Sequence, residues 1–144
     1  MKYRKPFIQE GETMCQVDLT KTLEELEDEY WGEPNFASSL VIQVHKLRKK
    51  TLGELNDENL RLLIGQQMSL TILLPLALER LVQNPLRSGD LYTGDLFCSV
   101  LKVRKEYWKE HKELKNELEE VIRTYEEVRK TLEEHISKYR RDHL

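Results

Sequence analysis

Glycine, proline and cysteine are all scarce in this sequence, which contains 6 Gly, 4 Pro and 2 Cys among 144 residues. It has no clear run of alternating apolar and polar residues, the pattern of a half-buried strand, and 34% of its residues are charged. These features favour helices over strands. The two cysteines, Cys15 and Cys98, provide no disulfide framework, so we expect buried thiols in a reducing cytoplasm.

The chain also lacks an apolar run long enough to cross a membrane, which needs about 18 continuous apolar residues. The most hydrophobic segment, residues 59–82, is interrupted by polar residues and a proline: Gln66, Gln67, Pro75, Glu79 and Arg80. Residues 1–10 have basic side chains but no apolar core of signal-peptide length. The formal net charge of −3 argues against a nucleic-acid-binding protein with a broad basic face. We therefore expect a cytoplasmic protein that binds neither membrane nor nucleic acid.

Residues 59–82 form the expected core of the fold. Residues 70–78 are nearly all apolar, which is typical of a helix buried on every side. A proline inside a helix costs roughly 3 kcal/mol, and Pro75 lies in this run. We therefore expect the helix to begin near Ser69 or Thr71, so that Pro75 falls in or just past its first turn. A kink at Pro75 is the alternative.

Further helices are expected on both sides of this core helix. Thr22 and Glu25 form a potential capping box that opens a short helix ending near Tyr30. Others should run from residue 36 or 38 to 49, from 56 or 57 to about 65, and from 93 or 95 onward. The chain is thus predicted to be all-α, a single-domain bundle of about five to six helices over residues 20–144, preceded by an N-terminal arm of residues 1–19.

The helix that ends at about Lys49 has an expected inner face and a basic end. Its inner face should consist of Leu40, Val41, Val44 and Leu47. Four basic residues crowd its C-terminal end: Lys46, Arg48, Lys49 and Lys50. Positive charge is favourable there because of the helix dipole, so these residues need no nucleic-acid partner.

From about Glu106 the chain is expected to form one long charged helix, because no Gly or Pro occurs after residue 94. Its inward residues recur at steps of four and three, as in a coiled-coil seam: Tyr107, His111, Leu114, Leu118, Val121, Tyr125, Val128, Leu132, His135 and Tyr139. Residues 106–141 would span on the order of 50 Å. We expect this helix to pack along its own domain. A homodimer through residues 107–139 is the second interpretation, since the far end could overhang the body.

The segment 22–34 contains six acidic residues and no Lys or Arg: Glu24, Glu25, Glu27, Asp28, Glu29 and Glu33. One interpretation is a solvated helix face whose acids suit the helix dipole. The other is an acidic docking patch for a basic partner. Tyr30 and Trp31 would supply aromatic anchors for such an interface, although Trp31 could equally be packed in the core.

The loop 84–95 is the one irregular stretch of distinctive composition, and loops often carry function. Asp90 and Asp95 suggest a metal site, but two aspartates without further ligands do not make a calcium loop. We therefore expect no metal, and we expect Thr93 or Asp95 to cap the next helix.

No catalytic constellation is recognisable. The four histidines, His45, His111, His135 and His143, form neither a His-Glu-x-x-His nor a Glu-x-x-His motif. There is no phosphate-binding glycine loop and no serine elbow. A helix-turn-helix over residues 57–83 fails because its second helix is apolar where base contacts are needed. The residues alone predict a protein that binds a partner, without catalysis or a cofactor.

A series of short motifs follows in a specific order: Thr22-Leu-Glu-Glu-Leu-Glu27, Trp31-Gly-Glu-Pro34, His45-Lys-Leu-Arg-Lys-Lys50, Leu60-Arg-Leu-Leu-Ile-Gly-Gln66, Leu74-Pro-Leu-Ala-Leu78, Asn84-Pro-Leu86 and Gly89-Asp-Leu-Tyr-Thr-Gly-Asp-Leu96. Together they resemble helical immunity proteins of bacterial contact-dependent growth inhibition systems, over roughly residues 20–105. The chain departs from that pattern at Thr51 and Thr93, where Pro is expected. The long helix, about residues 106–141, lies outside the resemblance.

The resemblance implies a cytoplasmic antitoxin that binds and neutralises the toxic C-terminal domain of a cognate effector, with one-to-one stoichiometry. Such toxins are often nucleases with basic surfaces, which an acidic surface complements. The first expected contact surface therefore consists of Glu24, Glu27, Asp28, Tyr30, Trp31 and Glu33. The second consists of Asp90, Tyr92 and Asp95. Reversing Glu27 and Asp28 to Lys should slow association with little change in thermal stability. A scaffolding protein that self-associates through the C-terminal helix is the alternative function.

Overall fold

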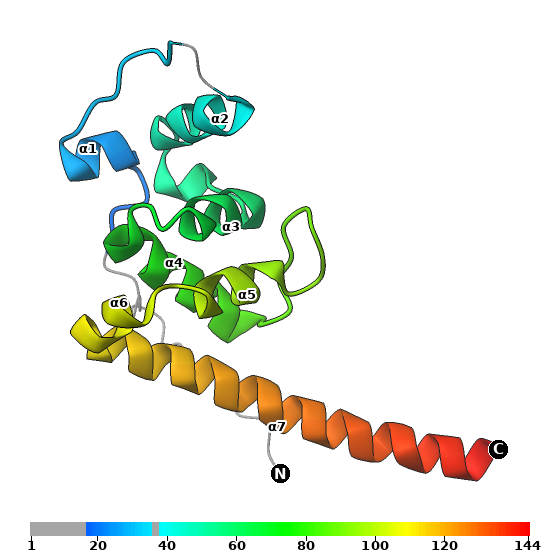
Figure 1. Ribbon diagram of the computed structural model, residues 1–144. Coiled ribbons are helices and arrows are strands. Elements are labelled where there is room, and N and C mark those ends of the chain that lie inside the picture. Colours follow the sequence, from blue (N-terminus) through cyan, green and yellow to red (C-terminus); the bar gives the residue numbers. More distant parts are fainter. Residues whose placement is uncertain (1–16, 36–37) are drawn as a thin grey trace.

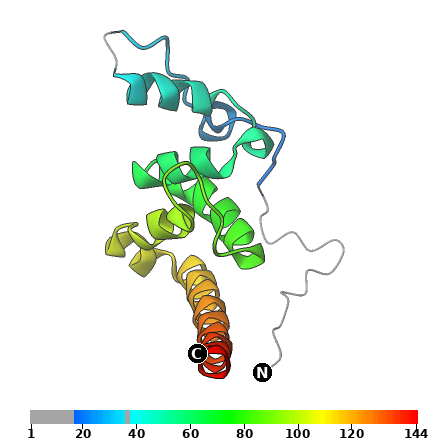
Figure 2. The ribbon, with the colours of Figure 1, turned by 90° about the vertical axis from the view of Figure 1, so that its right-hand side faces the viewer.

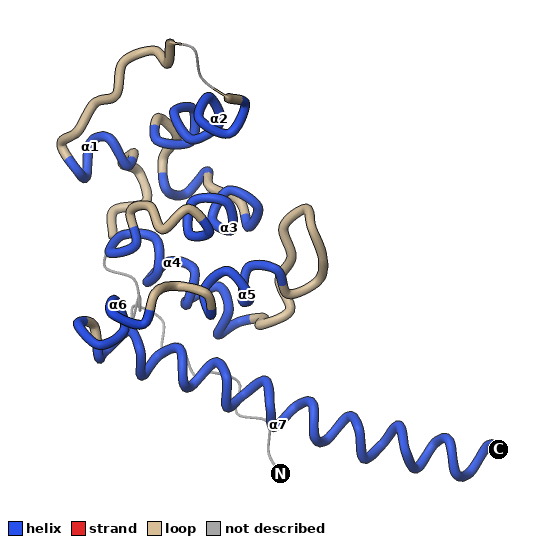
Figure 3. Tube along the Cα trace, in the orientation of Figure 1, coloured by secondary structure: helices blue, strands red, loops and turns tan. Residues whose placement is uncertain are grey.

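The computed structural model describes residues 17–35 and 38–144, and over these ranges the chain is built from helices without a strand (Figures 1 and 3). The only strand-like feature in this part is an isolated antiparallel bridge between Thr22 and Thr51. The predicted all-α class is confirmed. Most of the expected N-terminal arm, residues 1–19, lies outside the described residues, and so does Cys15.

The helices lie in successive tiers. In chain order they are α1 (Leu23–Glu27), α2 (Ser39–Arg48), the short 3-10 helix η1 (Leu52–Glu54), α3 (Asp57–Gly65), α4 (Leu70–Gln83), α5 (Asp95–Leu101), α6 (Lys105–Glu110) and α7 (Lys112–His143). In Figure 1, α1 and α2 form the top, α3, α4 and α5 the middle, and α7 runs beneath them. The view turned by 90° in Figure 2 shows the same order of tiers.

Helix α4 is the core element that the apolar run predicted. Its buried side chains surround the helix axis: Leu70, Leu73, Leu74, Leu76, Ala77, Leu78 and Leu81. Helices α3, α5 and α7 all contact it. Full burial of each leucine contributes about 1.5–3 kcal/mol, so this helix supplies much of the apolar stabilisation.

Helix α4 begins directly after Ser69, so Pro75 falls just past the first turn, as predicted. Proline cannot donate the hydrogen bond that the carbonyl four residues earlier, at Thr71, would otherwise accept. Thr71 is an exposed residue in the first turn of the helix, and a carbonyl left without its helical partner can bond to water where solvent reaches it. The cost of a proline inside the helix is thereby reduced.

Helix α1 is shorter than predicted. The Thr22 hydroxyl accepts a hydrogen bond from the Glu25 N–H at 3.1 Å, which confirms the Thr22 half of the predicted capping box. The Glu25 carboxylate accepts from the Thr22 hydroxyl at 3.2 Å rather than from the Thr22 N–H. The helix ends at Glu27 and does not continue to Tyr30, because Asp28 adopts the left-handed conformation at φ 50°. The Asp28 N–H then bonds back to the carbonyls of the last turn and closes the helix.

Helix α2 has a different buried face from the predicted one. Val44 and Leu47 are buried as expected, but Val41 is 41% exposed. Arg48 is buried in its place, with an exposed fraction of 1%. The buried face of α2 therefore consists of Val44, Leu47 and Arg48. One of the four basic residues at the end of this helix is thus buried.

The predicted long C-terminal helix is divided at His111, which has φ −127° and ψ 65°. The His111 N–H bonds to the Tyr107 carbonyl at 3.0 Å, and the two rings stack with centroids 3.9 Å apart. The break turns the chain so that Tyr107 and Trp108 of α6 and Leu118 and Val121 of α7 are all buried. No Gly or Pro marks this break in the sequence.

The second half of α7 leaves the body. Leu118 and Val121 are buried, whereas Leu132, Ile136 and Tyr139 are 55%, 45% and 62% exposed. Figure 1 shows the C-terminal end of α7 extending beyond the other helices. The structure thus confirms a long C-terminal helix. Its first half packs along the domain, as expected, and its far end overhangs the body, the possibility on which the second interpretation depends.

Candidate interaction surfaces

The acidic segment after α1 is fastened to α2 by the buried side chain of Arg48. Its Nη1 lies 2.5 Å from the Glu27 carboxylate, and its Nη2 donates to the Glu29 carbonyl at 2.9 Å. The guanidinium also lies over the Trp31 ring, 4.3 Å from the ring centroid. The segment 22–34 contains no basic residue, but the negative charge of Glu27 is paired with Arg48 of α2.

Glu27 links three helices rather than standing free on a surface. Besides the ion pair with Arg48, its carboxylate accepts a hydrogen bond from the Ser69 hydroxyl at 2.9 Å, at the start of α4. Removing one partner of a buried ion pair is strongly destabilising because the other charge stays buried. We therefore revise the expectation that reversing Glu27 leaves thermal stability unchanged.

Trp31 is half-buried and belongs to the packing of α2. Its ring meets that of His45 edge to face at a centroid distance of 5.1 Å. Its indole N–H donates to the Glu29 carboxylate at 3.2 Å, and Nδ1 of His45 lies 3.0 Å from the Gly32 carbonyl. Of the two interpretations of Trp31, the packing role is the one that these contacts fit.

The other residues of the first predicted surface divide into buried and exposed. Glu24 is only 8% exposed, and one of its carboxylate oxygens has no hydrogen-bond partner among the described residues. Asp28 is exposed, and Tyr30 is 66% exposed. The Glu33 side chain is 88% exposed, with Lys49 of α2 at 3.4 Å. Three members of the predicted surface are exposed without a buried ion-pair partner in the part of the chain that the structure describes, namely Asp28, Tyr30 and Glu33, and we call them the acidic edge.

In the loop 84–95, Asp95 is the anchor. It is 1% exposed, and its carboxylate accepts hydrogen bonds from the N–H groups of Gly89 at 2.6 Å, Leu91 at 3.0 Å and Tyr92 at 3.4 Å. Burial raises the pKa of Asp95, but these N–H groups and that of Leu96 outweigh it and hold the pKa below its usual range. Asp95 therefore shapes the loop from inside.

The predicted helix cap at Thr93 or Asp95 is wrong. The residue that precedes α5 is Gly94, in the left-handed region at φ 85°, and Asp95 is the first residue of the helix. Glycine adopts this conformation without strain, which lets the chain turn so that the Asp95 carboxylate points back to the loop. Asp95 does accept backbone hydrogen bonds, as a capping residue would, but they come from N–H groups of the preceding loop.

The same loop is held against the first turn of α3. The Glu58 carboxylate accepts from the Asp90 N–H at 2.8 Å and from Nε of Arg61 at 2.6 Å. The hydrogen bond from Arg61 holds the pKa of Glu58 below its usual range. Gly89 lies so close that an added Cβ would be 2.3 Å from the Glu58 carboxylate. The backbone of the loop is thereby fixed.

A second set of ion pairs holds the start of this loop. Asp57 pairs with Arg80 of α4 at 3.2 Å and with Arg87 of the loop at 3.0 Å. These pairs are not visible in the sequence, because their members are 23 and 30 residues apart. With both ends of the loop fixed, Leu91 and Tyr92 remain 64% and 51% exposed at its tip. Asp90 is exposed beside them.

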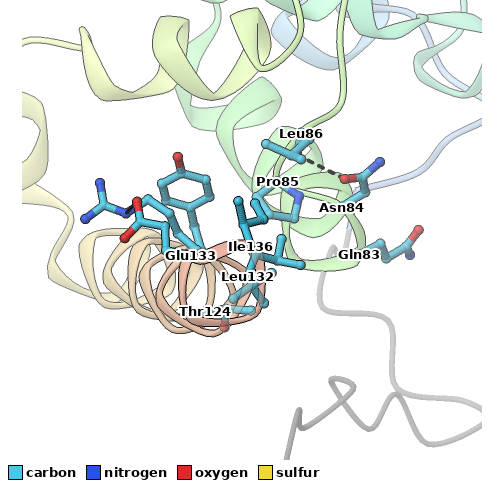
Figure 4. Close-up of a pocket in the computed structure, with 11 residues that line it drawn as sticks. Gln83, Asn84, Pro85, Leu86, Thr124, Leu132, Glu133 and Ile136 are labelled. Atoms are coloured by element: carbon cyan, nitrogen blue, oxygen red, sulfur yellow. Dashed lines mark hydrogen bonds and ion pairs between the residues drawn. The ribbon is translucent and has the colours of Figure 1, made fainter. Parts of the chain in front are cut away.

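The third surface is an apolar groove of about 600 Å³ between the end of α4 and the outer half of α7 (Figure 4). Figure 4 shows Leu132 and Ile136 directed toward Pro85 and Leu86. A second hollow of about 380 Å³ lies along Pro85 and Leu86 and is lined by Phe97 of α5. Neither hollow was predicted from the sequence; the signal for the groove was the apolar seam, which continues to Leu132 and Ile136.

Within residues 17–35 and 38–144, no group of three or more His, Cys, Asp or Glu side chains is placed to hold a metal ion. None of the helices in this part of the chain is long and apolar enough to span a membrane. As a class, the described part is therefore an all-α protein whose most developed surface features are a charged edge, a fixed loop and an apolar groove.

The chain belongs to the family of CDI immunity proteins, where CDI stands for contact-dependent growth inhibition: the family model matches residues 25–118. This confirms the resemblance seen in the ordered motifs and extends it through α6 into the start of α7. Membership implies a role in immunity to a CDI toxin. No curated protein and no solved structure matches the chain. The overhanging half of α7 lies outside the matched range.

Proposed function

We propose that this protein binds the C-terminal toxin domain of a cognate CDI effector in the cytoplasm and neutralises it by binding, one to one, without catalysis or a cofactor. The observation that carries the proposal is the family match over residues 25–118, which covers the end of α1 and every element from α2 to α6. An immunity protein of this kind acts by covering the toxin, so its function depends on exposed complementary surface.

The acidic edge, Asp28, Tyr30 and Glu33, is the first candidate contact surface. These residues lie on an irregular segment that Arg48 and His45 hold against α2 through backbone carbonyls. A segment that is fixed before binding loses little conformational entropy on association. The two acids favour a basic partner surface, and Tyr30 offers a large exposed ring as an anchor.

Glu24, Glu27 and Trp31 act behind this edge in the proposal. Their side chains are buried or engaged with α2 and α4, so they position the exposed residues and contribute little direct contact. Asp95 has the same relation to the second candidate surface, the loop tip with Asp90, Leu91 and Tyr92. In Figure 1 the acidic segment and this loop lie on different sides of the body, so we treat them as alternative contact surfaces. The loop tip ranks second because it carries one exposed acid, Asp90, against two on the acidic edge.

The deciding experiment is titration calorimetry of this chain against the toxin domain encoded immediately upstream, with an assay of toxin activity on the same samples. We expect tight one-to-one binding that abolishes the activity. Binding without loss of activity would leave a partner but no immunity role. Failure to bind the cognate toxin domain would overturn the proposal.

A further inference from the structure

The apolar stripe of α7 continues past the point where the body stops covering it. On a helix of 3.6 residues per turn, Val128, Leu132, Ile136 and Tyr139 share one side with Leu118 and Val121. The last two are 6% and 2% exposed against the body, whereas Leu132, Ile136 and Tyr139 are between 45% and 62% exposed. The same face is therefore a core face in the first half of α7 and an uncovered face in the second.

An uncovered stripe of this kind is unfavourable for a monomer. A helical segment that makes no tertiary contact is only marginally stable in water, because most helix stability in proteins comes from packing of the apolar face. The stripe also continues into the groove of about 600 Å³ beside Pro85 and Leu86. Contiguous exposed apolar surface of this kind marks an interaction site.

The charges beside the stripe indicate which molecule covers it. Four exposed residues on one flank alternate in sign along the helix: Glu126, Arg129, Glu133 and Arg140. Arg129 and Glu133 already lie 3.8 Å apart within the helix, a surface pair that a partner copy would extend into a network. In an antiparallel pair of helices, equivalent flanks face each other with their order reversed. With Leu132 on the two-fold axis, Glu126 of one copy then lies near Arg140 of the other, and Arg129 near Glu133. Each of the four pairs that this symmetry generates joins opposite charges.

The apolar residues agree with the same register. With Leu132 facing itself, Val128 faces Ile136 of the other copy and Tyr125 faces Tyr139. The end of each helix then lies at the level of the groove of its partner, against Pro85 and Leu86. In a parallel pair, by contrast, the charged row would face the other flank of the helix, which offers Thr124, Thr131, His135 and Lys138, and so a single lysine opposite four alternating charges.

We infer that a second copy of this chain occupies the exposed face, in a two-fold antiparallel pairing of α7 over residues 125–139. This range is narrower than the predicted dimer seam of 107–139, because Tyr107, Trp108, Leu118 and Val121 are buried within the domain itself. Such a symmetric pairing uses the same patch on both copies and closes as a dimer. The inference does not depend on the proposed toxin binding, since it concerns the chain alone.

Sedimentation velocity of the full chain over a range of concentrations tests this inference. We expect a monomer–dimer equilibrium. In Leu132→Glu a charge replaces the residue on the axis in both copies, so the dissociation constant should rise on the order of 100-fold. The matched control is Lys130→Gln, which changes the charge by the same amount at an exposed residue on the side of α7 opposite Leu132 and should dimerise like the wild type. Circular dichroism of both variants shows whether the helix is retained.

A mixing experiment separates pairing between copies from effects within one helix. Arg129→Glu and Glu133→Arg alone each place like charges opposite one another, so each variant should dimerise at least about tenfold more weakly than the wild type. A one-to-one mixture restores opposite charges across the heterodimer and should recover dimerisation. A wild-type chain that stays monomeric at every concentration would overturn the inference. If that monomeric chain also lost toxin binding in Leu132→Glu, the exposed face of α7 would be assigned to the toxin instead.

Discussion

Arg48 and Glu27 are 21 residues apart in the sequence, yet their side chains form an ion pair of 2.5 Å, with the arginine side chain only 2% exposed. The pair joins the end of α1 to the end of α2, and the hydrogen bond from Ser69 to Glu27 connects both to the start of α4. The orientation of the acidic edge therefore depends on a buried contact behind it.

We expect Glu27→Ala to lower the free energy of unfolding by about 2–4 kcal/mol, because it leaves the Arg48 charge buried without its carboxylate. The value lies toward the lower end for a buried pair because the Glu27 side chain is 26% exposed and partly screened by solvent. Urea unfolding measures the change. Glu33→Ala removes a side chain that is 88% exposed and paired only at the surface, so it should stay within about 0.5 kcal/mol of the wild type. Equal losses in the two variants would contradict an internal role for Glu27.

Burial of Arg48 shows where sequence reasoning stops. A basic residue in the last turn of a helix satisfies the helix dipole, so nothing local distinguished Arg48 from its neighbours Lys46 and Lys49. Its burial follows from contacts with Glu27, Glu29 and Trp31, which a single sequence does not place in space. The buried Val44 and Leu47, by contrast, follow from helical periodicity.

The same division holds elsewhere in the fold. Helix α4 was predictable because its apolar run and the position of Pro75 both constrain where it starts. The break at His111 was not, because no residue there disfavours a helix; it arises where α6 turns Tyr107 and Trp108 into the core. Asp95 anchors the loop only because Gly94 adopts the left-handed conformation. The Gly-Asp pair in the sequence is compatible with that conformation but does not establish it.

Asp95 should make stability depend on pH. Because its pKa is lower when folded, Asp95 stabilises the fold fully above its unfolded pKa of about 3.9, and this stabilisation is lost as the pH falls through the lower, folded value. We expect Asp95→Asn to cost about 1–3 kcal/mol at pH 7. The difference from the wild type should shrink below about pH 4. Urea unfolding at several pH values measures it.

Asp90→Asn is the matched control for Asp95→Asn. Asp90 is exposed in the same loop and contributes its backbone N–H, not its carboxylate, to the hydrogen bond with Glu58. Its replacement should leave the unfolding free energy within about 0.5 kcal/mol at every pH. A difference between wild type and Asp95→Asn that is constant across pH would show that the Asp95 charge is not what anchors the loop.

Gly89→Ala should displace the loop from α3. The added Cβ would lie 2.3 Å from the Glu58 carboxylate and 2.9 Å from the Glu58 Cα, and the latter is backbone that cannot rotate away. We expect a loss of about 1–3 kcal/mol, with faster amide hydrogen exchange at Asp90 and Leu91. Gly65→Ala, at the last residue of α3, meets no atom within 4 Å and should be neutral or slightly stabilising. Protection that is unchanged in Gly89→Ala would show that the loop is not held by this contact.

The acidic edge should act on the rate of toxin association. We expect the double variant Asp28→Lys, Glu33→Lys to slow association with the toxin domain by about tenfold or more at low salt, because long-range attraction by a basic partner becomes repulsion. Glu33→Lys should change thermal stability little, since its side chain is exposed and its ion pair with Lys49 lies at the surface. Asp28→Lys should cost about 1 kcal/mol, because Asp28 is in the left-handed region, which Asp tolerates better than Lys; circular dichroism shows that the variant is folded. The difference in rate should narrow as salt screens these charges.

The control for this rate is Glu119→Lys, Glu120→Lys, which reverses the same number of charges on exposed residues of α7. Because long-range steering depends on net charge as well as on position, the control should show a smaller decrease than the acidic-edge variant. Stopped-flow association at several salt concentrations measures both. Equal decreases would assign the effect to net charge alone and remove the acidic edge as the contact surface. A decrease confined to the acidic-edge variant, together with faster dissociation of Tyr30→Ala, would place the toxin beside the segment that Arg48 and Glu27 hold in position.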